Sequence, residues 1–306
     1  MISHRVHRDL ARAISSVENG IVELPAALAR LAHLGHVPPA HHAEVIGITG
    51  PPGAGKSTLV DRLIEGIRAG GESVAVIAVD PSSPFTQGAV LGDRVRMQRH
   101  AGDNGVFIRS MASREGGGGL APATRDAVRL AEAAGFDVVI VETVGVGQIE
   151  LEVVAVADQI VVVTVPALGD SVQTIKAGLT EIADIFVVNM ADRPGANRTA
   201  LDLKHMVREG QRDIPVLQTV AQDGTGVADL LAAILSRRGG SEVNAVRAVR
   251  FEVVRRARDR AVIAALASLD SPDGSAVLDR VRARELSRND AIDALLAIYG
   301  GPVHAH

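Results

Sequence analysis

The stretch Gly50-Pro-Pro-Gly-Ala-Gly-Lys56-Ser57 restricts what this chain can fold into more than any other feature. It satisfies the pattern G-x4-G-K-[ST]. It directly follows the apolar run EVIGIT (44–49) and precedes an amphipathic stretch that indicates a helix from about Ser57 to Ala69. A strand, a glycine-rich turn and a helix in this order aim backbone N–H groups into one concavity at a helix N-terminus. The sequence therefore predicts a loop that cradles nucleotide phosphates.

Two side chains of this loop have predicted roles in the chemistry. Lys56 is expected to reach the β- and γ-phosphates, and the Ser57 hydroxyl is expected to ligate Mg²⁺. We expect the whole loop to contact the nucleotide. The predicted contacts are Gly50, Pro51, Pro52, Gly53, Ala54, Gly55, Lys56, Ser57 and Thr58.

Apolar runs recur along the chain beyond this loop. They cover residues 73–79, 106–110, 137–142, 159–165, 184–189 and 215–219, and helical patterns separate most of them. Continuous apolar runs are typical of strands that helices cover on both faces. We therefore predict an α/β fold, a P-loop NTPase with a mostly parallel sheet between two layers of helices.

Helical extensions are predicted at both ends of the chain. We expect an N-terminal helical extension at 1–43, the nucleotide-binding domain at 44–238 and a C-terminal helical extension at 241–306. The turn-like segment SPDGS (271–275) is expected to break the last of these. The C-terminal extension either adds packing or serves as an oligomerisation arm, and the residues alone leave both open.

Composition excludes several classes of protein. Hydrophobic residues make up 47% of the 306 residues and charged residues 22%, which supports a sizeable core. A net charge of −4 gives no general attraction to nucleic acid or to an anionic membrane. The chain has no Cys, so disulfides, thiol nucleophiles and Cys-ligated metals are excluded. No apolar run is long enough to span a bilayer, and we expect a cytoplasmic protein.

Three acidic residues follow at places that suit a phosphate-bound cation. Asp80 ends the second apolar run, Glu142 ends the run 137–142, and Asp93 lies in the segment LGDR. The carboxyl ends of parallel strands converge on one crevice, so Asp80 and Glu142 are expected near Mg²⁺. The predicted metal ligands are Ser57, Asp80, Asp93 and Glu142, and the predicted catalytic residues are Lys56, Asp80, Asp93 and Glu142.

Two further motifs indicate a GTPase. Glu142-x-x-Gly145 resembles the D-x-x-G of GTPases, and the Gly145 N–H is expected to contact the γ-phosphate. Asn189-Met190-Ala191-Asp192 resembles N-K-x-D, with Met190 in place of Lys. The Asp192 carboxylate can accept from N1–H and the 2-amino group of guanine, which adenine lacks. We expect Asn189, Met190 and Asp192 at the base, together with Val220 and Ala221 after the last apolar run.

The motifs together resemble one family, the P-loop GTPases associated with adenosylcobalamin-dependent methylmalonyl-CoA mutase. These are the bacterial relatives of the human methylmalonic aciduria type A protein, and the label "arginine/ornithine transport system kinase" is attached to similar sequences. The resemblance covers about residues 40–235. The segments that carry it are GPPGAGKST, VDPSSPFTQGAVLGDRVRM (79–97), ETVGVGQIE (142–150), ALGDSVQTIKAG (167–178) and VNMAD (188–192).

The resemblance implies a function as well as a site. It implies slow GTP hydrolysis that the mutase stimulates, a role in loading and protecting that mutase, and a homodimer formed through the C-terminal extension. It implies Lys56 and Ser57 on phosphate and Mg²⁺, with Asp80, Asp93 and Glu142 around the cation. It also implies switches at 81–97 and 143–150 and a mobile partner loop at 166–176.

Three departures from the family pattern are expected to matter. Gln87 replaces a Gly in the first predicted switch, and SREGGGGLA (113–121) replaces a related glycine-rich segment, so loop motions are affected. Met190 cannot supply an ammonium, which affects nucleotide affinity. No Gln follows Gly145 directly, so the isolated protein is expected to be slow, with Gln148 the nearest candidate for orienting water.

Two other functions remain open from the sequence. One is a kinase that transfers the γ-phosphoryl group to a periplasmic amino-acid transport protein. The other is a metallochaperone GTPase, which the absence of Cys disfavours and for which only His41–His42 and the terminal His304 and His306 remain. The basic residues Arg94, Arg96 and Arg99 either meet phosphate or a partner, or form a solvated helix face.

Overall fold

The computed structural model describes residues 2–36, 42–81, 98–100, 102–113, 122–143, 153–166, 182–210, 213–239 and 271–287, with isolated positions between 246 and 295. The chain divides into two compact units, residues 1–248 and residues 249–306. The first contains the sheet and is described here by itself. Of the second, the structure describes one complete helix.

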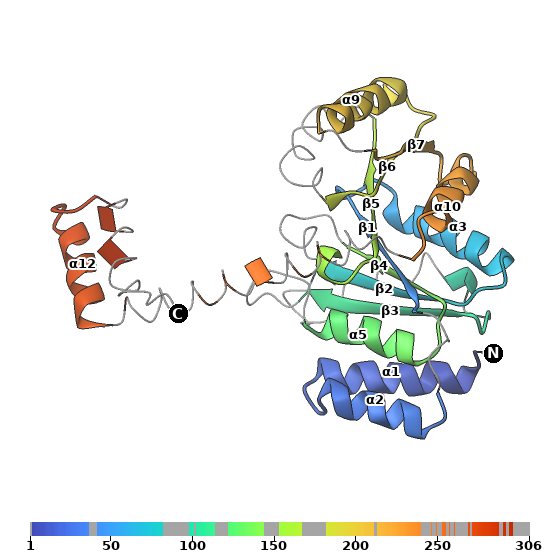
Figure 1. The fold of residues 1–306 in the computed structure, drawn as a ribbon, viewed down its shortest axis with the longest axis horizontal. Coiled ribbons are helices and arrows are strands. Elements are labelled where there is room, and N and C mark those ends of the chain that lie inside the picture. The colour runs from blue at the N-terminus through green and yellow to red at the C-terminus, as the bar shows by residue number, and fades with distance from the viewer. Residues whose placement is uncertain are drawn as a thin grey trace. The chain divides into compact units, whose positions relative to one another are not determined.

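A parallel sheet of seven strands forms the centre of the first unit (Figure 1). The strands are β1 (Glu44–Thr49), β2 (Val74–Pro81), β3 (Val106–Ser113), β4 (Val138–Glu142), β5 (Gln159–Thr164), β6 (Ile185–Asn189) and β7 (Val216–Thr219). Their order across the sheet is β3-β2-β4-β1-β5-β6-β7, and each neighbouring pair is parallel. Each apolar run predicted from the sequence overlaps one of these strands, although β2 and β3 extend past the ends of their runs, so the predicted α/β fold is confirmed.

Helices pack on both faces of the sheet. They are α1 (His4–Glu18), α2 (Leu24–His33), α3 (Lys56–Ala69), α5 (Pro122–Ala133), α9 (Ala196–Glu209) and α10 (Val227–Leu235), with short 3-10 turns η1 (Gln98–His100) and η2 (Val153–Ala155). Helices α3 and α10 pack together on one face, and α5 lies on the other. Helices α1 and α2 pack outside α5, so the N-terminal extension is part of the same compact unit as the sheet (Figure 1).

The strand order decides which loops meet. Strand β1 lies between β4 and β5, and Ile48 of β1 is opposite Glu142 of β4. The phosphate loop follows β1, so it begins beside the carboxyl end of β4. Chain order and spatial order diverge here, and ligands of open α/β sheets bind at such a point.

The hydrophobic core holds α3 against the central strands of the sheet. Strands β1, β4, β5 and β6 are buried along their whole length. Leu59, Leu63 and Ile64 of α3 are 0% exposed against them. Each fully buried aliphatic side chain of this size contributes about 1.5–3 kcal/mol. The first turns of α3 are therefore fixed by packing before any ligand binds.

The two terminal extensions show local features of their own. Ile21 is 72% exposed because α1 ends at Glu18 and Gly20 turns the chain at a φ of +66°. The segment SPDGS begins a helix, α12 (Pro272–Arg282), whose N-cap Ser271 accepts a hydrogen bond from the Gly274 N–H at 3.1 Å. Serine at the N-cap with proline next to it is a helix-start pattern.

Among the residues that the structure describes, no helix has the length and apolar character needed to cross a membrane.

Candidate functional site

The loop between β1 and α3 has the glycines that its path requires. Gly50, Gly53 and Gly55 have φ angles of +139°, +76° and +80°, in the left-handed region that side chains disfavour. A Cβ at Gly50 would also collide with the carbonyl oxygen of Val163 in β5, and one at Gly55 would meet the side-chain amide of Asn189. The loop therefore fits tightly between two strand ends.

Lys56, the first residue of α3, lies folded against this loop. Its Nζ donates to the carbonyl oxygens of Gly50 at 2.7 Å and Pro51 at 3.0 Å, and the residue is 6% exposed. The ammonium is thus held at the mouth of the concavity by two backbone oxygens. A cation fixed there is suited to an anionic ligand bound over the loop.

Ser57 and Glu142 are brought together by the adjacency of β1 and β4. The Ser57 hydroxyl donates to Oε1 of Glu142 at 2.7 Å, and the two residues are 6% and 4% exposed. Beside them, the Thr143 hydroxyl donates to that of Thr49 at 3.0 Å. Hydroxyl and carboxylate oxygens are the donors that Mg²⁺ prefers. These two predicted metal ligands, 85 positions apart in sequence, therefore form a donor set that fits Mg²⁺.

The remaining predicted metal ligands are described less fully. Asp80 belongs to β2, and Ala78 of that strand is opposite Glu142, so the Asp80 backbone lies two residues beyond that level on the neighbouring strand. The side chain of Asp80 falls outside the described residues. So do Asp93, Gly145, Gln87 and Gln148, and most of the predicted switches and loops at 81–97, 143–150, 113–121 and 166–176.

Asn189 connects three segments at the other end of the site. The residue is 2% exposed, and its Nδ2 donates to the carbonyl oxygen of Ala54 in the phosphate loop at 2.8 Å. Its Oδ1 accepts from the Thr219 hydroxyl and from the Ala221 N–H, both at 3.1 Å. Sequence reasoning expected Asn189 at the base. The structure shows it holding the loop after β7 against the phosphate loop.

The other predicted base contacts surround Asn189. Met190 has a φ of +56° and packs, half-buried, against the core, whereas Asp192 is exposed two residues later. Ala221 is 3% exposed, and the Val220 N–H donates to the Thr225 carbonyl at 2.9 Å to close a tight turn. The structure thus gathers these residues beside the phosphate loop at the ends of β6 and β7.

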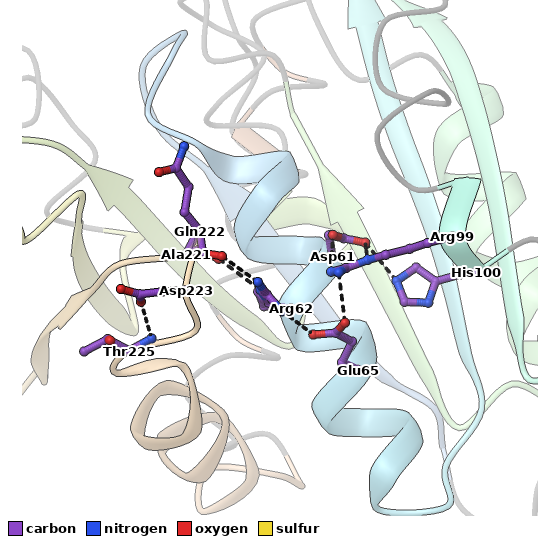
Figure 2. Close-up of polar contacts among 9 residues, drawn as sticks. All are labelled: Asp61, Arg62, Glu65, Arg99, His100, Ala221, Gln222, Asp223 and Thr225. Atoms are coloured by element: carbon purple, nitrogen blue, oxygen red, sulfur yellow. Dashed lines mark hydrogen bonds and ion pairs between the residues drawn. The ribbon is translucent and has the colours of Figure 1, made fainter.

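The turn after Ala221 is shaped by its own polar groups. Asp223 Oδ1 accepts from the Thr225 N–H at 2.9 Å, and this hydrogen bond lowers the pKa of Asp223. Arg62 of α3 reaches the same turn and donates to the carbonyl oxygens of Ala221 and Gln222 (Figure 2). Sequence reasoning missed Arg62. In the sequence, its position six residues after Lys56 on the predicted helix was the one indication that Arg62 could lie near the site.

Of the three basic residues considered from the sequence, Arg99 lies among the described residues, and Arg94 and Arg96 do not. Arg99 pairs with Asp61 and Glu65 of α3 (Figure 2). His42, considered for metal binding, lies near a carboxylate, with Nε2 3.2 Å from Oε1 of Glu132. Within the described part of the chain, no group of three or more His, Asp or Glu side chains is arranged to hold a metal ion.

Comparison with known proteins identifies similar chains. The family model "Methylmalonyl Co-A mutase-associated GTPase MeaB" matches residues 10–240. A Pyrococcus abyssi protein provisionally named a GTPase is 46% identical over 312 residues, 96% of this chain and 94% of that one. The fused isobutyryl-CoA mutase of Paraburkholderia xenovorans is 35% identical over 277 residues, 82% of this chain and 21% of that protein. A crystal structure of a protein named "LAO/AO transport system kinase" aligns with a TM-score of 0.61 at 26% identity, covering 98% of this chain and all of that one.

Replacement of Asn189 tests its connecting role. Asn189→Ala leaves the Ala54 carbonyl and the Ala221 N–H without their partner, and we expect a loss of about 2–4 kcal/mol in the free energy of unfolding. Chemical denaturation followed by circular dichroism measures it. The control Thr219→Val removes only one of the three hydrogen bonds and is expected to cost less than half as much. Equal costs for the two variants would contradict the connecting role.

Proposed function

We propose, because this chain belongs to the methylmalonyl-CoA mutase-associated GTPase family, that it is the GTP-driven switch of an adenosylcobalamin-dependent acyl-CoA mutase. As a member of that family the chain binds guanine nucleotides and hydrolyses GTP. The finer proposal is that it gates cofactor loading and protects the mutase, with methylmalonyl-CoA mutase as the first candidate client. The structural observation that supports the GTP-binding part of the proposal is the buried Ser57–Glu142 contact below a phosphate loop.

The phosphate end of the site is proposed to work by positioning. The backbone N–H groups of the loop residues other than Pro51 and Pro52, together with the Lys56 ammonium, hold the phosphates in line for attack by water. Ser57 and Glu142 are proposed to hold Mg²⁺, with Asp80 and Asp93 completing its surroundings. When bound, the cation neutralises charge on the β- and γ-phosphate oxygens. We propose that Gly145 donates its N–H to the γ-phosphate and that a partner accelerates a slow intrinsic rate.

The base end is proposed to select guanine. Asp192, which is exposed, is proposed to accept from the two donors on the guanine edge. Met190 is proposed to cover one face of the base with its unbranched side chain, and Val220 and Ala221 to pack at its rim. Asn189 supports this end by accepting from the Ala221 N–H, and it is also proposed to contact the base.

Two findings support the mutase as client. The family is named for its association with methylmalonyl-CoA mutase. In addition, a stretch similar to this chain occupies 21% of a relative that is named a fused isobutyryl-CoA mutase. A GTPase joined to a mutase in one polypeptide acts on it at a high effective concentration. We propose that this chain makes the corresponding contact as a separate protein in the cytoplasm.

The C-terminal extension, 241–306, is proposed to form a homodimer. Three valines of the second unit, Val249, Val253 and Val254, lie at helical positions and are 60–63% exposed. Val249 and Val253 are four residues apart, a spacing that puts two side chains on the same face of a helix. A second copy of the chain is the proposed occupant of that face, in agreement with the family resemblance.

A kinase remains the second candidate, because the solved structure that aligns with 98% of this chain is named a transport system kinase. Incubation with GTP labelled on its γ-phosphate separates the two. Release of free phosphate without a labelled protein supports the switch, whereas label transferred to a purified periplasmic amino-acid-binding protein supports the kinase.

Client specificity is tested by co-purification. The purified chain, loaded with either a non-hydrolysable GTP analogue or GDP, is passed over immobilised methylmalonyl-CoA mutase and, in parallel, isobutyryl-CoA mutase. We expect retention by the first mutase that changes at least threefold between the two nucleotides. Nucleotide-dependent retention by the isobutyryl enzyme alone would reassign the client. Retention by neither, from a chain that binds GTP, would reject the mutase proposal.

The proposed Mg²⁺ ligands are tested by their metal dependence. Ser57→Ala and Glu142→Gln are each expected to raise the Mg²⁺ concentration for half-maximal GTP hydrolysis about tenfold or more, because each removes an oxygen donor. Phosphate release across a Mg²⁺ titration measures this. The control Ser236→Ala alters a serine whose hydroxyl donates to the Ala233 carbonyl oxygen at the end of α10. Unchanged Mg²⁺ dependence in both variants would reject the assignment.

The proposed guanine contact is tested by changing its hydrogen-bonding character. Asp192→Asn places an amide donor where a carboxylate stood, so the affinity for GDP is expected to fall about tenfold or more. The affinity for xanthosine diphosphate, which has an acceptor at C2, is expected to rise. Calorimetry with both nucleotides measures the change in preference. Asp202→Asn, at an exposed carboxylate that pairs with Arg198, serves as the control. A parallel loss for both nucleotides would contradict base recognition by Asp192.

A further inference from the structure

Arg62 donates two hydrogen bonds to the turn at 221–222, at the proposed base end of the site. Its Nε donates to the Ala221 carbonyl oxygen at 3.1 Å, and its Nη2 donates to that of Gln222 at 2.5 Å (Figure 2). Two successive backbone oxygens thus accept from one planar guanidinium. A fork of this kind fixes direction as well as distance, which a single ammonium does not.

Both backbone polar groups of Ala221 are hydrogen-bonded to side chains. Its N–H donates to Oδ1 of Asn189, and its carbonyl oxygen accepts from Arg62. The side chain of Ala221 is nearly inaccessible, so these two hydrogen bonds set where the peptide lies. The hydrogen bond to Asn189 involves a motif that the sequence predicts, whereas the hydrogen bond from Arg62 does not.

Glu65 holds Arg62 in place and connects it to a second charged pair. Oε2 of Glu65 accepts from Nη1 of Arg62 at 3.0 Å, and its Oε1 lies 3.0 Å from Nη1 of Arg99 (Figure 2). Arg99 in turn donates from Nε to Oδ1 of Asp61 at 2.8 Å. Glu65 is therefore shared between two arginines that come from different segments.

The Asp61 end of this cluster is the more enclosed one. The side chains of Asp61 and His100 are 12% and 10% exposed, and His100 Nε2 lies 2.8 Å from Oδ1 of Asp61. Arg99 and His100 belong to η1, which follows the segment 82–97 directly in the chain. One side of α3 therefore contacts both the η1 turn and the turn at 221–222.

We propose that Arg62 is a positioning residue for guanine binding, and that Glu65 and Arg99 restrain it, so that the η1 turn contributes to the affinity for the base. The inference rests on the proposed function, since it takes the turn at 221–222 to border the guanine. Helix α3 also begins with Lys56, about 9 Å along its axis from Arg62 at 1.5 Å per residue. The same rigid helix thereby sets the distance between the phosphate end and the base end.

A purely structural role for Arg62 predicts different measurements. A residue that only stabilises the fold lowers stability and turnover without preference for one step. A residue that positions the base loop raises KM for GTP and Kd for GDP while kcat stays near its original value, because the phosphate end is untouched. Local hydrogen exchange in the peptide covering 219–226 supplies a readout that is independent of activity.

The experiment compares Arg62→Ala, Arg62→Lys and the control Arg198→Ala in the full chain. Arg198 is an exposed arginine of α9 that pairs with Asp202 one turn away. For Arg62→Ala we expect GDP to bind about tenfold more weakly, kcat to change less than twofold, and exchange to rise in 219–226 but not in β1 or α3. Arg62→Lys replaces the planar fork of donors by a single ammonium, and its GDP affinity is expected to fall about threefold. This variant keeps the test valid if Arg62→Ala does not fold.

The restraint by Glu65 and Arg99 is tested with a double-mutant cycle. Arg99→Ala alone is expected to weaken GDP binding about threefold, and adding it to Arg62→Ala is expected to cause almost no further loss, because both act through the same turn. Additive effects would reject the connection. Unchanged GDP affinity in Arg62→Ala, or a matched fall in kcat, would overturn the positioning role. If the unaltered chain fails to prefer GDP to ADP, the proposed function itself fails.

Discussion

The hydrogen bond between the Ser57 hydroxyl and the Glu142 carboxylate depends on one choice of topology, the placement of β4 directly beside β1. Because β4 inserts between β1 and β2, the start of α3 faces an acid that lies 85 positions after Ser57 in the chain. The buried position of both groups keeps water from competing for the contact. The Ser57–Glu142 contact is consequently formed by the fold before a ligand arrives.

A buried amide has a comparable role at the base end. Asn189 uses its donor on Ala54 and its acceptor on Thr219 and Ala221, so the loops after β1 and β7 share one side chain. Neither loop can move far without breaking a hydrogen bond that is shielded from water. The proposed nucleotide site is therefore one connected unit, supported on the ends of parallel strands.

Much of the fold and part of the site could be predicted from the sequence. Continuous apolar runs indicate buried parallel strands, and the phosphate loop is defined by local spacing, so both are visible in a window of a few residues. The strand order is not visible in such a window, because it depends on which runs pair. The sequence therefore predicted that Ser57 and Glu142 lie near the same crevice, but not that they form a hydrogen bond. Arg62 and Glu65 were missed for the same reason. A charged pair on an amphipathic helix looks solvated until the turn it contacts is placed beside it.

The positive φ of Met190 gives the departure from the family pattern a specific meaning. A left-handed backbone admits unbranched side chains at a modest energetic cost but strongly disfavours residues branched at Cβ. Methionine and lysine are alike in this respect, with stems of similar length and flexibility. The exchange thus preserves the path of the main chain and removes only a formal charge. If Met190 covers the base as proposed, it offers the shape of a lysine stem there without the positive charge.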